Sequence, residues 1–226
     1  MTLPQGAKKA RAVRSMFDAI APRYDLVNRV MTFRMDVGWR RRTIRELALA
    51  RGSRVLDLAC GTGDFCRELA QRELVPIGVD FSWGMLAAAR TDAPLVQGDA
   101  LCLPMPGRAV DGVTCGFALR NFVELDPFFA ELARVVRPDG RIALLEVAEP
   151  ANPILRAGHG VYFGKVVPVI GKLLSDGAAY RYLPKSVAYL PPPDTMLRMI
   201  EAAGFRDVRR ILLSGGITQL IIGTRA

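Results

Sequence analysis

Histidine and paired cysteines are scarce in this chain of 226 residues. It contains one histidine, His159, and four cysteines, none of them spaced as Cys-x-x-Cys. Zinc sites need clustered Cys and His ligands, and disulfide frameworks need paired cysteines. The sequence therefore predicts neither a metal centre nor a disulfide scaffold, and we expect the thiols to stay reduced, as in a cytosol.

Long apolar runs are also missing. The first 14 residues are basic and polar and lack the apolar core of a signal peptide, which argues against secretion. The most apolar region, between Asn152 and Pro193, is interrupted by Lys165, Pro168 and Lys172. A transmembrane helix needs about 20 apolar residues, so we interpret this region as a substrate-covering cap or an amphipathic segment lying on a membrane.

Acidic residues are the minority among the charged ones. The chain has 31 Lys and Arg against 22 Asp and Glu, which gives a net charge of +9. Such a surface favours nucleic acid or the negatively charged cytoplasmic leaflet of a membrane, although a GC-rich coding genome would also produce an arginine excess. Half of the residues are hydrophobic and 23% are charged, as is typical of a folded globular protein.

Strand-like and helix-like apolar patterns alternate along the chain. Strands are expected at Arg54–Leu58, Val75–Val79, Leu95–Gln97, Val110–Cys115 and Arg141–Glu146, the last after a turn at Pro138–Gly140, and a closing antiparallel hairpin at Val208–Leu213 and Leu220–Thr224. Helices are expected at Val13–Ile20, Trp39–Ala50, Phe65–Arg72, Met85–Arg90 and Pro127–Val136, and another after a cap at Asp194. This alternation predicts an α/β fold with a mostly parallel, doubly wound sheet.

We expect a single domain over residues 1–226, because this length suits one hydrophobic core with appended segments. Its predicted parts are an N-terminal helical segment at 1–50, a ligand-binding core at 51–150, a cap insertion at 151–193, and a closing helix and hairpin at 194–226.

Polar residues gather where the predicted strands end, which is where open α/β sheets bind ligands. The loop Gly61-Thr62-Gly63 is small enough for close approach of a ligand, but Cys66 stands where a dinucleotide fingerprint has its third glycine. Acidic strand ends suit S-adenosylmethionine, a cation without phosphate. Asp57 would face its ammonium group, Asp80 its ribose hydroxyls and Asp99 its adenine amino group.

Several blocks, spread over nearly the whole chain, resemble the ubiquinone/menaquinone biosynthesis C-methyltransferase family. They are Phe17–Asn28, Val55–Asp64, Val79–Met85, Gly98–Pro104, Phe117–Phe122, Arg134–Gly140, Tyr182–Leu190 and Ala203–Phe205. The resemblance implies a Rossmann-like class I S-adenosylmethionine-dependent methyltransferase, with a mostly parallel seven-stranded sheet and a C-terminal antiparallel hairpin. With the strand ends, it marks as cofactor-binding Tyr24, Asp57, Gly61, Thr62, Gly63, Asp80, Phe81, Met85, Asp99, Ala100 and Gly116.

The same resemblance points to Arg120 and Asn121 as the catalytic pair, with Asp99 nearby. Arginine keeps its proton, so Arg120 is assigned to stabilising a developing quinolate and Asn121 to orienting the ring hydroxyl. The motif blocks contain no histidine to act as a base. We interpret His159 as a solvent-facing or cap-segment residue.

The chain departs from the family pattern at three places. Thr32 and Asp36 stand where the family usually has Ser and His, and Pro138-Asp139-Gly140 replaces Pro-Gly-Gly. Glu146-Val147-Ala148 replaces Glu-x-Ser. The first and third departures lie where substrate contacts are plausible, so they bear on the methyl acceptor more than on the cofactor.

The resemblance implies methylation of a lipophilic quinol by an enzyme held at the anionic inner face of the plasma membrane. The Tyr182–Leu190 block and the lack of an extra domain favour demethylmenaquinol over the 2-polyprenyl-6-methoxybenzoquinol of ubiquinone biosynthesis. The alternatives are an RNA or other small-molecule methyltransferase and a non-catalytic S-adenosylmethionine-binding protein. No nucleic-acid partner is expected, because Leu190 precedes the Pro191–Pro193 run where the adenine-methylating motif has Asn or Asp. A homo-oligomer is compatible with the sequence.

Overall fold

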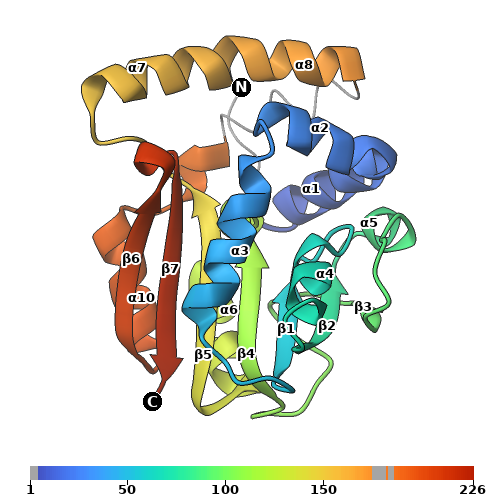
Figure 1. The fold of residues 1–226 in the computed structure, drawn as a ribbon, viewed down its shortest axis with the longest axis vertical. Coiled ribbons are helices and arrows are strands. Elements are labelled where there is room, and N and C mark those ends of the chain that lie inside the picture. The colour runs from blue at the N-terminus through green and yellow to red at the C-terminus, as the bar shows by residue number, and fades with distance from the viewer. Residues whose placement is uncertain (1–4, 175–181, 183–185) are drawn as a thin grey trace.

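A seven-stranded sheet runs through the centre of the computed structural model, which describes residues 5–174, 182 and 186–226 (Figure 1). The strand order is β3-β2-β1-β4-β5-β7-β6, with β7 antiparallel to both of its neighbours and the other pairs parallel. The predicted mostly parallel sheet with a C-terminal hairpin is confirmed. The strands are β1 Arg54–Leu58, β2 Val75–Asp80, β3 Leu95–Gln97, β4 Val110–Gly116, β5 Val136–Val147, β6 Phe205–Leu213 and β7 Thr218–Arg225.

Helices cover both faces of the sheet and the edge at which the parallel strands end (Figure 1). The α-helices are α1 Gly6–Ile20, α2 Tyr24–Met31, α3 Met35–Leu47, α4 Asp64–Ala70, α5 Trp83–Ala87, α6 Leu125–Val135, α7 Pro153–Val161, α8 Val167–Leu174 and α10 Pro193–Ala202. Shorter turns of helix are η1 Ala21–Arg23, η2 Leu119–Asn121, the π-helical η3 Tyr162–Val166, η4 Val187–Tyr189 and η5 Ser214–Gly216.

The strand residues alternate between two apolar layers, as the two-residue period of a β-strand requires. Val55 of β1 packs in the layer that contains Leu47 of α3, and the next residue, Leu56, packs in the layer that contains Phe128 of α6 and Ile200 of α10. Both faces of the strand are therefore buried. This explains why β1 reads as a nearly continuous apolar run instead of an alternating pattern.

The turn expected at Pro138–Gly140 is instead part of one long strand, β5. The pairing of β5 with β4 shifts register there, from Val110 opposite Val136 to Gly112 opposite Arg141. The extra residues form a bulge in which Asp139 has a φ of 61°, a backbone conformation that is also common in turns. A turn-like sequence therefore marks a bulge here, because its neighbours remain paired in the sheet.

Two helix starts also differ from expectation. Tyr24–Met31 forms a helix of its own, α2, directly after the short turn η1 that the Ala-Pro-Arg sequence makes. Asp194 does not cap α10: Pro192 is the N-cap residue and Asp194 lies within the first turn. Proline is well suited to a helix start because its φ is already helical, and an acidic residue in that turn is favoured by the helix dipole.

Helices α7, η3 and α8 run end to end above the carboxyl ends of the parallel strands, as a roof over the sheet (Figure 1). Asn152 caps the N-terminus of α7 by accepting hydrogen bonds from the amides of Ile154 and Leu155. The Tyr162 hydroxyl donates to the Met31 carbonyl of α2 at 2.7 Å. The 151–193 insertion therefore begins as a helical cap, while residues 183–185 of the expected Tyr182–Leu190 block lie outside the described residues. Among the helices of the described part, none is both long enough and apolar enough to cross a membrane.

Candidate active site

Two adjoining cavities lie above the strand ends, the larger one under the roof and the smaller one beside α1. The larger has a volume of about 490 Å³ and the smaller about 120 Å³. Residues shared by their linings come from the N-terminal helices and from the ends of β1 and β4: Phe17, Tyr24, Ala59, Gly61, Gly116 and Phe117. The two cavities therefore meet directly above the carboxyl ends of the central strands.

The smaller cavity is built from the ends of β2 and β3. Asp80 ends β2, and its carboxylate accepts hydrogen bonds from the amides of Gly61 and Ser82, both at 2.8 Å. Burial raises the pKa of Asp80, and these hydrogen bonds oppose that effect. Asp99 follows β3, is exposed, and accepts a hydrogen bond from the Leu101 amide at 2.9 Å. Two carboxylates thus lie in one cavity at adjacent strand ends, as the sequence predicts.

Apolar residues complete this cavity and give it the character of an adenosine site. Phe81, Met85 and Ala100 all line it, beside Asp80 and Asp99. Carboxylates that accept from hydroxyl and amino groups, between apolar walls that contact a base, are the groups that S-adenosylmethionine requires for its ribose and adenine. The side chains of this cavity therefore fit the adenosine end of the cofactor.

The glycine loop leads from the smaller cavity to the larger one. Gly61 has a φ of 56° and lines both cavities, and a Cβ built on it would lie 4.0 Å from the Tyr24 ring. Thr62 lines the larger cavity and donates its hydroxyl hydrogen to Asp25 of α2 at 2.5 Å. The glycine loop is thus held to the N-terminal helices at the point where the two cavities meet. Tyr24 also lies at this point, and burial raises the pKa of the Tyr24 hydroxyl.

Two of the expected cofactor residues, Asp57 and Gly63, lie outside both cavities. Asp57 lines neither of these cavities: it is 1% exposed and accepts hydrogen bonds from Thr114 at 2.9 Å and Cys66 at 3.5 Å. Gly63 is also absent from both linings and precedes α4 with a φ of 82°. Gly116 lines both cavities, but an added Cβ would come within 2.6 Å of the Phe65 ring. The carboxyl of Asp57 is turned inward because α4 and β4 supply its partners.

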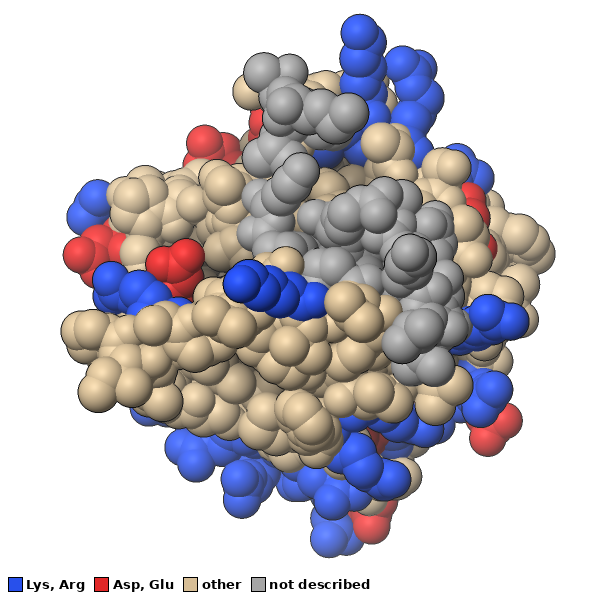
Figure 2. All heavy atoms as spheres, turned by 90° about the horizontal axis from the view of Figure 1, so that it is seen from above, with Lys and Arg blue, Asp and Glu red and all other residues tan. Residues whose placement is uncertain are grey.

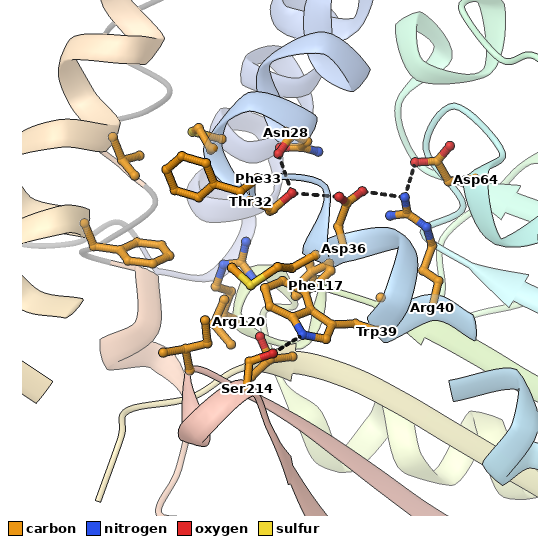
Figure 3. A pocket seen from close by; sticks show the side chains of 18 of the residues that line it. Asn28, Thr32, Phe33, Asp36, Trp39, Arg40, Asp64, Phe117, Arg120 and Ser214 are labelled. Carbon is orange, nitrogen blue, oxygen red and sulfur yellow. Dashed lines mark hydrogen bonds and ion pairs between the residues drawn. The ribbon is translucent and has the colours of Figure 1, made fainter. Parts of the chain in front are cut away.

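The walls of the larger cavity are mainly apolar and are crossed by one chain of polar contacts (Figure 3). The Thr32 hydroxyl lies 2.7 Å from Asp36, which pairs with Arg40 at 2.5 Å. Arg40 in turn pairs with Asp64 of α4 at 3.0 Å. The sequence marks Thr32 and Asp36 only as departures from a family pattern. Thr32 follows α2 and Asp36 lies in the first turn of α3, so the turn between the two helices brings their side chains together.

Arg120 lies at the base of the larger cavity and is held by a buried ion pair. Its guanidinium pairs with Glu146 of β5, whose side chain is fully buried, and its backbone amide donates to the same carboxylate at 3.2 Å. The Arg120 Nε is buried and has no hydrogen-bond partner in the described part of the chain. Glu146 was not expected as a site residue, although it is the one acidic residue in the apolar stretch Ile142–Val147.

Asn121 does not share this position. It lines the smaller cavity, donates to the Phe117 carbonyl at 3.5 Å and accepts a hydrogen bond from the Tyr182 hydroxyl at 3.3 Å. The expected catalytic pair is therefore divided, with Arg120 on the side of the larger cavity and Asn121 on the side of the smaller one. A single turn of helix, η2, is enough to point neighbouring side chains in different directions.

Comparison with known proteins assigns the chain to a family. The model of the ubiE/COQ5 methyltransferase family matches residues 5–225. The chain is 41% identical to a demethylmenaquinone methyltransferase of Roseiflexus castenholzii, over 99% of this chain and 97% of that protein. It is 45% identical to a protein of the same name from Deinococcus radiodurans, over 94% of this chain and 93% of that protein.

Solved structures support the fold. An S-adenosylmethionine-dependent methyltransferase of Thermotoga maritima matches with a TM-score of 0.66 at 16% identity, covering 94% of this chain and 99% of that one. A Haemonchus contortus phosphoethanolamine N-methyltransferase in complex with S-adenosylmethionine matches with a TM-score of 0.60 at 14% identity, covering 80% of this chain and 51% of that one. S-adenosylmethionine is the cofactor, as predicted. The chain belongs to the ubiE/COQ5 methyltransferase family and is a C-methyltransferase that uses this cofactor.

Proposed function

We propose that the chain methylates a ring carbon of a polyprenyl quinol, and specifically demethylmenaquinol. The observation that carries this proposal is the larger cavity of about 490 Å³, which combines apolar walls with the buried guanidinium of Arg120 and opens into the smaller cavity. A lipophilic ring with one developing negative charge fits such a cavity, because the walls exclude water and the cation stabilises the charge. The names of the relatives from Roseiflexus and Deinococcus favour the naphthoquinol.

In this proposal the cofactor supplies an electrophilic methyl group on a sulfonium. Tyr24, Gly61 and Gly116, which line both cavities, border the place where the methyl group meets the ring. The protein aligns the two reactants and keeps water away, which are the main requirements of an in-line methyl transfer. Arg120 stabilises charge on the quinol oxygen, and Asn121 orients the ring hydroxyl from the side of the smaller cavity.

The test is a methyl-transfer assay with the purified protein, S-adenosylmethionine and chemically reduced quinones. We expect demethylmenaquinol to gain one methyl group, as measured by mass spectrometry, and the 2-polyprenyl-6-methoxybenzoquinol to react more slowly. Reduced and oxidised demethylmenaquinone form the matched control, because only the quinol ring is electron-rich enough to attack. Faster methylation of the benzoquinol would move the assignment to ubiquinone biosynthesis, and methylation of neither would reject the quinol proposal.

Replacing Asp80 should weaken cofactor binding. Asp80→Asn removes the charge and keeps an acceptor for only one of the Gly61 and Ser82 amides, so we expect affinity for S-adenosylmethionine to fall by about 1 to 3 kcal/mol, the range for a lost buried partner. Isothermal titration calorimetry measures the change. Asp92→Asn, at an exposed loop carboxylate, is the control. An unchanged dissociation constant for Asp80→Asn would place the ribose elsewhere.

We also propose that the roof rests on an anionic membrane surface, at the inner face of the plasma membrane. Its outer side exposes apolar side chains, including Val161 at 56% and Val169 at 57%. Figure 2, which looks down on this side, shows a broad tan surface with blue Lys and Arg side chains on and around it. Exposed Lys165 and Arg156 belong to the same roof. An apolar strip with basic neighbours is the pattern of a helix that lies in a membrane interface.

We expect the protein to bind vesicles that contain phosphatidylglycerol and to detach as the salt concentration rises. Val161→Asp combined with Val169→Asp should lower binding by ~10-fold or more, because two exposed apolar side chains are lost. Neither residue lines a cavity, so affinity for S-adenosylmethionine should not change. Vesicle co-sedimentation is the measurement. Equal binding to neutral and anionic vesicles at low salt would argue against the electrostatic part of the proposal.

A further inference from the structure

Two buried polar atoms without a partner line the same cavity. In the described part of the chain, the buried side-chain nitrogens that lack a hydrogen-bond partner are Nε of Arg42, Arg120 and Arg141 and Nε2 of His159. Of these, Arg120 and His159 line the larger cavity, and Arg42 and Arg141 line neither of the two cavities described. Buried polar groups are usually hydrogen-bonded, so an orphaned pair in one cavity indicates that a ligand completes them.

His159 is well placed to act on that ligand. It lies on α7 in the roof, and its ring packs against Phe163 with centroids 4.4 Å apart. Burial lowers the pKa of His159, and the nearby Glu149 carboxylate opposes that effect. The lowered pKa keeps the imidazole neutral at pH 7, so one ring nitrogen retains a free electron pair. An orphaned Nε2 on a neutral ring can accept a proton from a hydroxyl group.

The other bases around the larger cavity are already engaged. Asp36 is paired with Arg40 and lies beside the Thr32 hydroxyl, and Asp64 is paired with both Arg40 and Arg67. The Tyr162 hydroxyl donates to a backbone carbonyl. A carboxylate held by an arginine is a weaker proton acceptor, because the cation stabilises its charged form. Among the described lining residues, His159 is the neutral base that has no such commitment.

We propose that His159 accepts the proton of the quinol hydroxyl next to the carbon that is methylated. This inference rests on the proposed function and goes beyond it by naming the base. As the proton moves to Nε2, the O–H electron pair enters the ring and the ring carbon forms a bond to the methyl group. The electron pair of the broken C–S bond stays on sulfur. The methylated carbon then loses its ring proton to water, the carbonyl oxygen regains a proton, and His159 releases its own, so one proton leaves per turnover.

His159→Gln keeps a polar side chain of similar length but cannot take up a proton, and His159→Ala removes the group altogether. We expect kcat with demethylmenaquinol to fall by about 10²- to 10⁴-fold in both, the range for a lost general base, with unchanged affinity for S-adenosylmethionine. The wild-type rate should fall as pH drops through the pKa of His159, and the variants should lose this limb. Added imidazole should restore part of the rate of His159→Ala. Ala157→Gln, an exposed change on the same helix outside the cavity lining, should keep wild-type turnover.

A second measurement does not depend on turnover. Because His159 is the only histidine, selective ¹³C labelling gives a single imidazole NMR signal, and its titration midpoint should shift when a non-reactive quinol analogue binds. If the wild type methylates no quinol, the proposed function fails, and the role of His159 in that reaction fails with it. If the wild type is active while both variants stay within threefold of it, or raise KM with an unchanged pH profile, His159 is not the base. A titration midpoint that does not change when the analogue binds would overturn the proposal as well.

Discussion

Arg120→Lys should lower turnover by about 10- to 1000-fold while leaving affinity for S-adenosylmethionine unchanged, the range for one lost electrostatic stabiliser. Lysine retains the positive charge that Glu146 requires, but it lacks the planar guanidinium with its orphaned Nε, and Arg120 lines the larger cavity. The effect should appear in kcat, because charge on the quinol oxygen develops only as the reaction proceeds. Single-turnover kinetics and calorimetry of cofactor binding measure the two quantities separately.

Arg120→Ala needs a control for folding. Glu146 is fully buried, and removing the arginine that pairs with it leaves an unpaired carboxylate that costs about 3 to 5 kcal/mol of stability. The double variant Arg120→Met with Glu146→Gln removes both charges and should fold, yet it should remain as inactive as Arg120→Ala. Loss of S-adenosylmethionine affinity with normal turnover in Arg120→Lys would instead assign Arg120 to the cofactor site.

Asp57→Asn should stabilise the protein at alkaline pH. Burial raises the pKa of Asp57 from 3.8 to about 7, with the hydrogen bonds from Thr114 and Cys66 opposing the rise. A pKa raised by folding means that the group contributes its full stability below the unfolded pKa and loses it as pH rises through the folded pKa. A rise of about three units corresponds to about 4 kcal/mol, so the variant should gain up to that amount over the wild type above pH 8.

The pH range over which the two stabilities differ identifies Asp57 as the titrating group. The free energies of unfolding of the wild type and Asp57→Asn should coincide below pH 4 and diverge between pH 4 and 7, as measured by urea denaturation. Asp80, whose pKa burial also raises, is present in both proteins, and its charge is one cause of the raised pKa of Asp57. Asp92→Asn, at an exposed carboxylate, should show no such divergence. A constant difference at every pH would mean that folding does not change the pKa of Asp57.

Asp57 and Asp80 show how alike two strand-end carboxylates look in sequence and how differently they are placed. Both are buried, but Asp80 ends its strand and reaches the smaller cavity, whereas Asp57 is one residue from the end of β1. Partners from α4 and β4 hold the Asp57 carboxyl below the glycine loop. We therefore expect replacement of Asp57 to change stability and replacement of Asp80 to change the affinity for the cofactor.

Local patterns were sufficient to determine the fold and the cofactor. β1 and β3 begin and end at the predicted residues, because short apolar runs bounded by polar loops leave a buried strand few alternatives. The order of strand, glycine loop and helix also places Gly61, Asp80 and Asp99 at one edge of the sheet, because parallel strands end on the same side. Both inferences depend on a strand and the loop that follows it, which are neighbours along the chain.

Only the tertiary structure decided which way the site residues face. Arg120 and Asn121 are adjacent in sequence, yet Glu146 holds the first at the larger cavity while the second lines the smaller one. His159 has no pattern that separates it from a surface residue, and it lines the larger cavity because the roof packs on α2 through the Tyr162 hydroxyl. These placements depend on contacts between segments far apart in the chain. Local periodicity carries no information about such contacts, so the sequence determined the chemistry at the strand ends and the packing determined the cavity in which each side chain acts.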